Sequence, residues 1–187
     1  MQQAQDEAKK QKLQRYEEVA KDCQNRFKTY SEVIKHPYLE AKQIKSYSLK
    51  LHNKSLVVPI YNVDGEIRSL QFIQEDGSKR FVSAGQVKGN IFLIGTDFNS
   101  LNKVESLVVV EGMATGVSVW DATQIPVACV FSANFGNDAV ENIRKKTDAR
   151  IYLAFDNDKT DIGRKKAEEI ASRYYNCLVR IPSIEGD

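Results

Sequence analysis

The sequence has 187 residues, of which 42% are hydrophobic and 28% charged, so a folded core is expected and wholesale disorder is excluded. With 27 basic and 25 acidic side chains the net charge is only +2, which excludes a histone-like or ribosomal composition. Any contact with nucleic acid must therefore come from local clusters of charge. The three cysteines, Cys23, Cys129 and Cys177, form no C-x-x-C pair, which argues against a disulfide scaffold or a zinc ribbon within this chain.

Nothing in the sequence resembles a membrane or secretion signal. The longest apolar run, residues 125–131, is far too short to span a bilayer, and the polar start has no apolar signal segment. We therefore expect a cytoplasmic protein with no membrane partner. The abrupt end at residues 184–187 leads us to expect a fragment of a longer protein.

Residues 1–36 are expected to form an N-terminal amphipathic helix. Residues 4–35 contain no Gly or Pro, and apolar side chains recur there at steps of three and four. These positions are Leu13, Tyr16, Ala20, Cys23, Phe27, Tyr30 and Ile34. Pro37 predicts the end of the helix, because a proline disfavours helical backbone at the residue before it. The stripe either packs on the rest of the protein or forms a coiled-coil seam.

The pattern of residues 37–103 predicts a small α+β subdomain with an antiparallel sheet. Strand-like runs are separated by turn signals such as Asp64-Gly65 and residues 75–78. The runs that we expect to form this sheet are 55–61, 67–73, 79–83 and 91–94.

Residues 104–187 predict an α/β domain, because apolar strands alternate with amphipathic helices. The expected strands are 107–110, 127–131, 151–155 and 177–181. The expected helices are 114–120, 137–146 and 162–174, the second of them capped by Asn137 or Asp138. This alternation is typical of a parallel sheet that helices cover on both faces.

Acidic residues follow two of the expected parallel strands. Glu111 comes after the first strand, and Asp156 and Asp158 come after the third. If the strand order is 2-1-3-4, these carboxylates meet at one edge of the sheet. Carboxylate oxygens of this kind suit Mg²⁺ or Mn²⁺ and point to phosphoryl or nucleotidyl transfer. The alternative is that Asp158 or Asp161 caps the following helix.

The same residues carry a resemblance to a known family. Residues 107–112, followed by residues 154–158, resemble the Toprim domain that DNA primases, topoisomerases and some nucleases share. The resemblance covers roughly residues 104–182. The E-G-M-A-T-G run at 111–116 and the G-R-K-K-A run at 163–167 look most like the primases of plasmids and phages.

This resemblance implies a Toprim-like parallel four-stranded sheet with flanking helices. It implies that Glu111 acts as a general acid or base or as a shared metal ligand. It also implies that Asp156 and Asp158 hold Mg²⁺ or Mn²⁺. Thr115 stands where replicative primases carry an Asp, which points away from the replicative enzyme.

The resemblance extends upstream into the smaller subdomain. Residues 56–65 and 79–83 look like the region that precedes the Toprim domain in bacterial-type primases, and residues 36–44 look like its opening helix. The family then implies that Lys79 faces nucleic acid or nucleotide. We expect Lys79 and Arg80 to neutralise phosphates, and the alternative is a solvated strand face.

Two further regions could bind nucleic acid or nucleotide. Asn134 and Ser132 follow the second strand of the parallel sheet, where they could contact a phosphate. Arg164 begins the helix next to Asp158, and the alternative there is a solvated helix face.

The resemblance implies the catalytic core of a DNA primase. Such an enzyme is a metal-dependent nucleotidyltransferase that joins ribonucleotides on a single-stranded DNA template, here during plasmid or phage replication or transfer. No P-loop and no zinc module occur, so a helicase or a zinc-binding module would come from a longer chain or from partners. A Toprim-type DNA nuclease and a non-catalytic nucleic-acid-binding or partner-binding module are the alternatives. The strand-rich block at 55–94 together with Lys79 favours primase over nuclease, and the intact acidic set disfavours a non-catalytic module.

Overall fold

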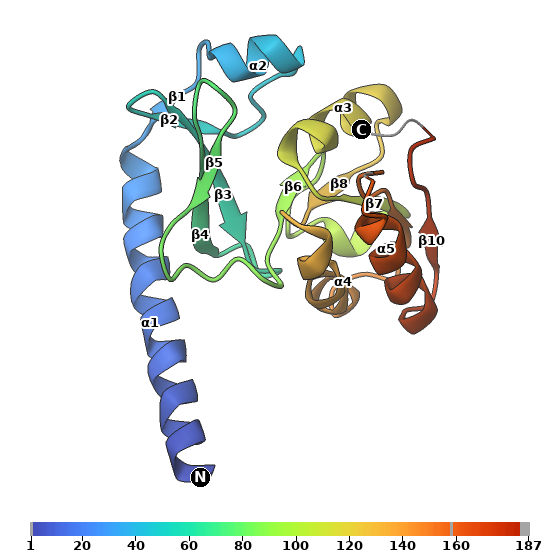
Figure 1. Cartoon of the computed structure of the whole chain (residues 1–187). Helices are drawn as coiled ribbons and strands as arrows, with labels where there is room; N and C mark the ends of the chain where they lie inside the picture. The colour runs from blue at the N-terminus through green and yellow to red at the C-terminus, as the bar shows by residue number, and fades with distance from the viewer. Residues whose placement is uncertain (1, 158, 184–187) are drawn as a thin grey trace.

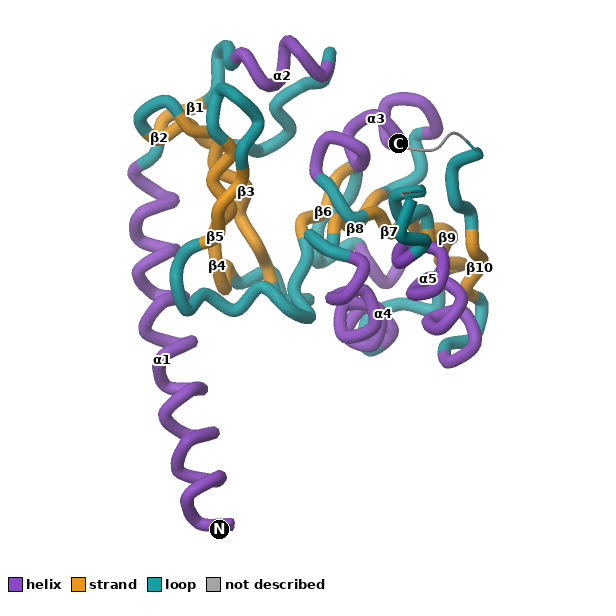
Figure 2. Tube along the Cα trace, in the orientation of Figure 1, coloured by secondary structure: helices purple, strands orange, loops and turns teal. Residues whose placement is uncertain are grey.

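The computed structural model describes residues 2–157 and 159–183 and shows two lobes side by side (Figure 1). We call residues 2–90 the small lobe and residues 91–183 the large lobe. The small lobe combines a long helix with an antiparallel sheet, and the large lobe is a sheet flanked by helices (Figure 2). The domain boundaries expected from the sequence remain a prediction.

Helix α1, Gln2–Thr29, lies along the antiparallel sheet with its second half only. Ala20 and Cys23 are buried against the sheet, whereas residues 2–15 are exposed and extend beyond it (Figure 1). The predicted end of the helix at residue 35 is wrong. The backbone turns after Thr29 so that β1, Ser31–Glu32, can pair with β2, Lys50–His52, and this leaves Ile34 98% exposed.

The predicted antiparallel sheet of the small lobe is confirmed, with strand order β1-β2-β3-β4-β5. Its main strands are β3, Ser55–Tyr61, β4, Ile67–Ile73, and β5, Lys79–Phe81. Gly65 adopts φ 85° in the β3–β4 turn, a conformation that glycine tolerates best. The short helix α2, Pro37–Lys42, begins at His36, whose ring accepts a hydrogen bond from the Tyr38 N–H.

Strand β6, Phe92–Ile94, belongs to the large sheet, so its predicted place in the small sheet is wrong. It pairs antiparallel with β8, Val127–Cys129, and covers the edge of that strand. Phe92 and Ile94 are 1% and 2% exposed because both side chains enter the core beneath α3. The burial of these two side chains, rather than strand propensity, decides which sheet the strand joins.

The large sheet has the order β10-β9-β7-β8-β6, so its parallel strands have the 2-1-3-4 order on which the expected meeting of the carboxylates depended. Its other elements are β7, Ser106–Val110, α3, Met113–Thr123, the 3-10 turn η2, Ala133–Phe135, α4, Gly136–Arg144, β9, Arg150–Leu153, α5, Ile162–Arg173, and β10, Cys177–Val179. A further 3-10 turn, η1, spans Leu101–Lys103. Helices α4 and α5 pack on one face of the sheet, and α3 packs on the other.

The two lobes share one apolar cluster. Leu56, Val58 and Ile73 from the small sheet pack in the same cluster as Val117 of α3 and Val110 of β7. Burial of this shared surface stabilises the relative position of the lobes. Residues at the ends of both sheets are therefore held in a defined arrangement.

The N-terminus of α4 is built differently from the prediction. Phe135 occupies the cap position without a side-chain cap, so the predicted capping by Asn137 or Asp138 is wrong. Gly136 is the first residue of α4. Only glycine fits there, because a Cβ would lie 2.7 Å from the ring of Phe155. The turn η2 runs directly into α4, and the Ser132 hydroxyl caps η2 by accepting a hydrogen bond from the Asn134 N–H.

All three cysteines are free and buried. Burial raises the pKa of the Cys23 thiol to about 11 and raises the pKa of the Cys129 thiol strongly. Because the thiolate is the reactive form, we expect a thiol reagent at mildly alkaline pH to label the folded chain very slowly. Labelling of the same chain unfolded in guanidinium gives the reference, and a thiol that reacts as fast when folded would contradict this burial.

No helix among the described residues is both long enough and apolar enough to cross a membrane.

Candidate catalytic and metal site

A cavity of about 530 Å³ lies between the lobes at the carboxyl ends of the large sheet's parallel strands. The charged side chains that the small lobe contributes to its lining are Lys42, Glu75, Asp76 and Lys79. The large lobe contributes Gly112, Thr115 and Asp156. The small-lobe side of the cavity therefore carries both amino groups and carboxylates, and the large-lobe side carries the Asp156 carboxylate. This is the edge of a parallel sheet at which ligands usually bind.

Glu111 joins the ends of three strands through its carboxylate. It follows β7, and its Oε2 accepts a 2.8 Å hydrogen bond from the Ala133 N–H after β8. Its Oε1 accepts a 3.2 Å hydrogen bond from the Asp156 N–H after β9. Hydrogen bonds from backbone donors to a charged carboxylate are stronger than neutral ones, so they fix its orientation. The sequence predicted Glu111 at this edge but not these two backbone donors.

Asp156 is half-buried and lines the cavity, whereas Asn157 is not among the described residues that line this cavity. The Asn157 amide donates to the Pro182 carbonyl at 3.0 Å. Asp158, the second predicted ligand of this segment, lies outside the described residues. The structure thus places Glu111 and Asp156 at neighbouring strand ends and leaves the role of Asp158 a prediction.

Gly163 allows the first turn of α5 to approach the Asp156 backbone. A Cβ at position 163 would lie 2.3 Å from the Asp156 carbonyl oxygen, a distance that no packed side chain tolerates. The spacing from the acidic residues to this glycine was visible in the sequence, but its steric reason was not. Glycine at this position therefore permits the close packing of α5 against the Asp156 backbone.

The donor set fits a hard divalent cation. Within residues 2–157 and 159–183 no three potential ligands form a metal-binding group. Mg²⁺ is commonly held by one or two carboxylates, with water and substrate phosphate completing its shell. Glu111 and Asp156 supply such carboxylates beside a cavity that has room for a phosphate.

Lys79 and Arg80, which the sequence assigned together to phosphates, point to opposite sides of β5. Lys79 lines the cavity with Asp156. The Arg80 guanidinium lies 5.5 Å from the centre of the Phe72 ring, on the side of the sheet that packs against α1. Alternation of side chains along a strand accounts for this separation.

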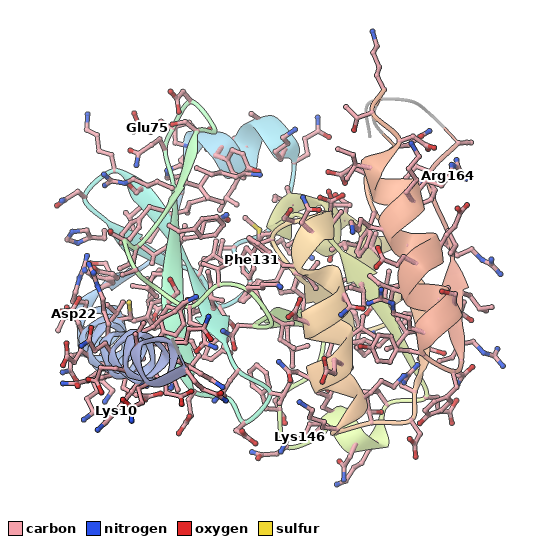
Figure 3. All side chains as sticks on the ribbon, turned by 60° about the horizontal axis from the view of Figure 1, so that its bottom comes forward. Lys10, Asp22, Glu75, Phe131, Lys146 and Arg164 are labelled. Atoms are coloured by element: carbon pink, nitrogen blue, oxygen red, sulfur yellow. The ribbon has the colours of Figure 1, made fainter. Side chains whose placement is uncertain are left out.

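Asn134 and Arg164 are not among the described residues that line the cavity. Asn134 is exposed on η2, where its N–H donates to the Ser132 hydroxyl. Arg164 lies on α5, far from the small lobe (Figure 3), and pairs with Asp161 at 3.2 Å. Asp161 makes no side-chain cap to α5, so its predicted capping role is wrong.

An aromatic pair that the sequence did not indicate forms a contact between the lobes. Phe131 follows β8 with φ 69° and lies between the lobes (Figure 3). Its ring meets that of Phe81 on β5 edge to face, with ring centres 6.0 Å apart. The sequence carries no signal for this contact because it joins residues of different sheets.

Comparison with known proteins gives matches over most of this chain. A protein-family profile described as Toprim domain matches residues 106–180. Two Escherichia coli proteins named DNA primase TraC are 29% and 30% identical in alignments 146 positions long that cover 72% of this chain. The matched region is 14% and 10% of those proteins, so the chain spans a small part of their length.

Solved primase structures have the same fold. The primase fragment of the bacteriophage T7 primase-helicase protein matches with a TM-score of 0.58 and 21% identity, covering 83% of this chain and 65% of that one. A DnaG primase catalytic domain bound to single-stranded DNA matches with a TM-score of 0.63 and 12% identity, covering 93% of this chain and 73% of that one.

Proposed function

Because residues 106–180 form a Toprim domain, in a chain homologous to the DNA primase TraC, we propose that this chain is the catalytic core of a DNA primase. It joins ribonucleoside triphosphates on a single-stranded DNA template, with Mg²⁺ or Mn²⁺, in plasmid or phage replication or transfer. The observation that carries the proposal is the cavity in which Lys79 faces the Asp156 side of the large lobe. Phosphoryl chemistry requires a place for both the cation and the phosphates.

The chemistry divides between the two sides of this cavity. Mg²⁺, when bound, would neutralise charge on the triphosphate and favour ionisation of the attacking hydroxyl. Asp156, together with Asp158, would hold the cation, and Glu111 would share it or accept the proton of the 3′-hydroxyl. The ammonium groups of Lys42 and Lys79 would hold the phosphates in place as the bond forms.

Gly112 supports a close approach of phosphate to the large lobe. It precedes α3 with φ −104°, and a Cβ there would meet only the Thr115 hydroxyl, at 3.7 Å. The fold therefore does not need glycine at this position for packing. The open space lies beside the first N–H groups of α3, which attract anions.

The surroundings of the core are proposals as well. We propose that it acts in the cytoplasm, where template and nucleotides are present. A helicase or a zinc-binding module would select or unwind the template, supplied by a longer chain or by a partner. The DnaG catalytic domain that shares this fold binds single-stranded DNA, and we propose the same kind of template here.

Oligoribonucleotide synthesis on single-stranded DNA with Mg²⁺ or Mn²⁺ and labelled nucleotides tests the function. Primers that lengthen with time support the primase. Metal-dependent shortening of the template without primers would instead support a Toprim-type nuclease, which uses the same carboxylates. Template binding without either reaction would support a non-catalytic module.

The Lys79→Gln variant tests the phosphate role of the small lobe. We expect it to weaken binding of single-stranded DNA or nucleotide about fivefold at low salt and to reduce the salt slope by about 0.7, as expected for one phosphate contact. Fluorescence anisotropy across a salt series measures both. Lys103→Gln on η1, which removes an exposed lysine elsewhere, is the matched control. An unchanged slope in Lys79→Gln would remove this lysine from the site.

A further inference from the structure

A second hollow, of about 710 Å³, lies on the small lobe between the end of α1, the β2–β3 turn and strands β4 and β5. We call it the outer groove. The side chains that give it charge and aromatic surface are Arg26, His52, Lys54, Phe72, Arg80 and Phe81. It is distinct from the cavity that holds Asp156, because no described residue lines both.

The outer groove is positively charged. Arg26, Lys54 and Arg80 line it, and no carboxylate is among its described lining residues. Arg26 pairs with Asp22 at 3.0 Å, but neither Lys54 nor Arg80 forms an ion pair within the described part of the chain. Two cations are therefore available to an anionic ligand. In a chain whose net charge is only +2, such a cluster is a local feature.

The cations lie among aromatic rings. The guanidinium groups of Arg26 and Arg80 lie 5.9 and 5.5 Å from the centre of the Phe72 ring. His52 stacks on Tyr30 with ring centres 4.3 Å apart, and Phe81 is 39% exposed. Planar guanidinium groups and exposed rings stack well on nucleic-acid bases, while the positive charge attracts the backbone.

Strand β5 connects the outer groove to the catalytic cavity. It is the last strand of its sheet, and its residues are exposed. Lys79 faces the cavity, Arg80 faces the outer groove, and Phe81 lines the groove while it contacts Phe131 between the lobes. A single strand that leaves the cavity can therefore cross the edge of β5 and continue along cations and rings.

We propose that the outer groove binds single-stranded DNA, the part of the template a few nucleotides away from the reacting end. The distance of the bound DNA from the reacting end rests on the proposed primase function, whereas binding of single-stranded DNA to the outer groove does not. The stacking is independent of base identity, so the site holds the template without selecting a sequence.

The test compares two charge-matched variants in the absence of metal and nucleotide. The groove variant is Lys54→Gln with Arg80→Gln, and the control is Lys9→Gln with Arg15→Gln on the exposed half of α1. Anisotropy with an oligothymidylate of about 15 nucleotides should show about tenfold weaker binding by the groove variant at low salt. Its salt slope should fall by about 1.4, as expected for two lost contacts to a single strand. Equal thermal midpoints verify the fold.

A second readout locates the strand directly. Photo-crosslinking of a thiothymidine oligonucleotide to the wild-type chain should label peptides that contain His52 and Phe81. Equal affinity in the groove variant and the control, or crosslinks confined to the cavity around Lys79 and Gly112, would overturn the proposal. A groove variant that loses affinity for RNA alone would overturn it too. Absence of primer synthesis with normal groove binding would contradict the primase function and leave this inference intact.

Discussion

Replacing Asp156 with Asn is expected to reduce metal-dependent nucleotide incorporation about 1,000-fold or more, because the change removes a charge at the place where the proposed function brings cation and phosphate together. Glu111→Gln should be at least as damaging. Both oxygens of Glu111 accept backbone N–H groups, so a glutamine places its NH₂ against one of those donors. Initial rates of labelled primer synthesis, measured over a range of Mg²⁺ concentrations, quantify both effects.

The control for these variants is Asp161→Asn, an equal loss of charge on a carboxylate that pairs with Arg164 on α5 rather than with a residue of the cavity. It should retain normal synthesis. Urea unfolding should show that Asp156→Asn is as stable as the wild type. Synthesis by Asp156→Asn at the wild-type rate would contradict the assignment of this carboxylate to the metal site.

Gly163→Ala is expected to destabilise the fold by about 1–3 kcal/mol, as other overpacked positions do. At a helix position with free space around the glycine, the same change would raise the free energy of unfolding by about 0.5–1 kcal/mol. The sign of the change in unfolding free energy therefore tests whether position 163 is crowded. The added Cβ would lie 2.3 Å from the Asp156 carbonyl oxygen, and either α5 or the loop must move. Because Asp156 would move with the loop, kcat should fall as well. Urea unfolding and primer synthesis measure the two effects.

Gly112→Ala is the matched control for stability. Its Cβ would meet only the Thr115 hydroxyl, at 3.7 Å, so unfolding free energy should change by less than about 0.5 kcal/mol. A Gly163→Ala variant as stable as the wild type, with unchanged kcat, would show that glycine is not required for the approach of α5 to Asp156.

The parallel strands of the large sheet and the helices between them could be predicted because their signal is periodic. Apolar strands alternate with helices over residues 106–182, and the 2-1-3-4 order brings Glu111 and Asp156 to one edge. The strand at 92–94 could not be assigned in the same way. Three apolar residues after a hairpin fit either sheet, and only the burial of Phe92 and Ile94 under α3 decides between them.

Other failures have local causes. The apolar stripe predicted a helix to residue 35, but pairing of β1 with β2 requires the chain to turn after Thr29. Asp161 could cap α5 by its position, yet its carboxylate pairs with Arg164. The phosphate roles of Lys79 and Arg80 stay predictions, but alternation along β5 places the two side chains in different hollows, which the sequence pattern did not distinguish.

The place of β6 in the large sheet has a consequence for how this protein can be divided. A fragment that began at residue 104 would keep β7 to β10 but lose the strand that covers β8. The backbone N–H and C=O groups of β8 that now pair with β6 would face solvent as an open sheet edge, which invites aggregation or strand exchange between copies. A fragment of the large lobe that is to stay soluble must therefore start before Phe92. That start lies within residues 37–103, which the sequence pattern assigned to the small subdomain.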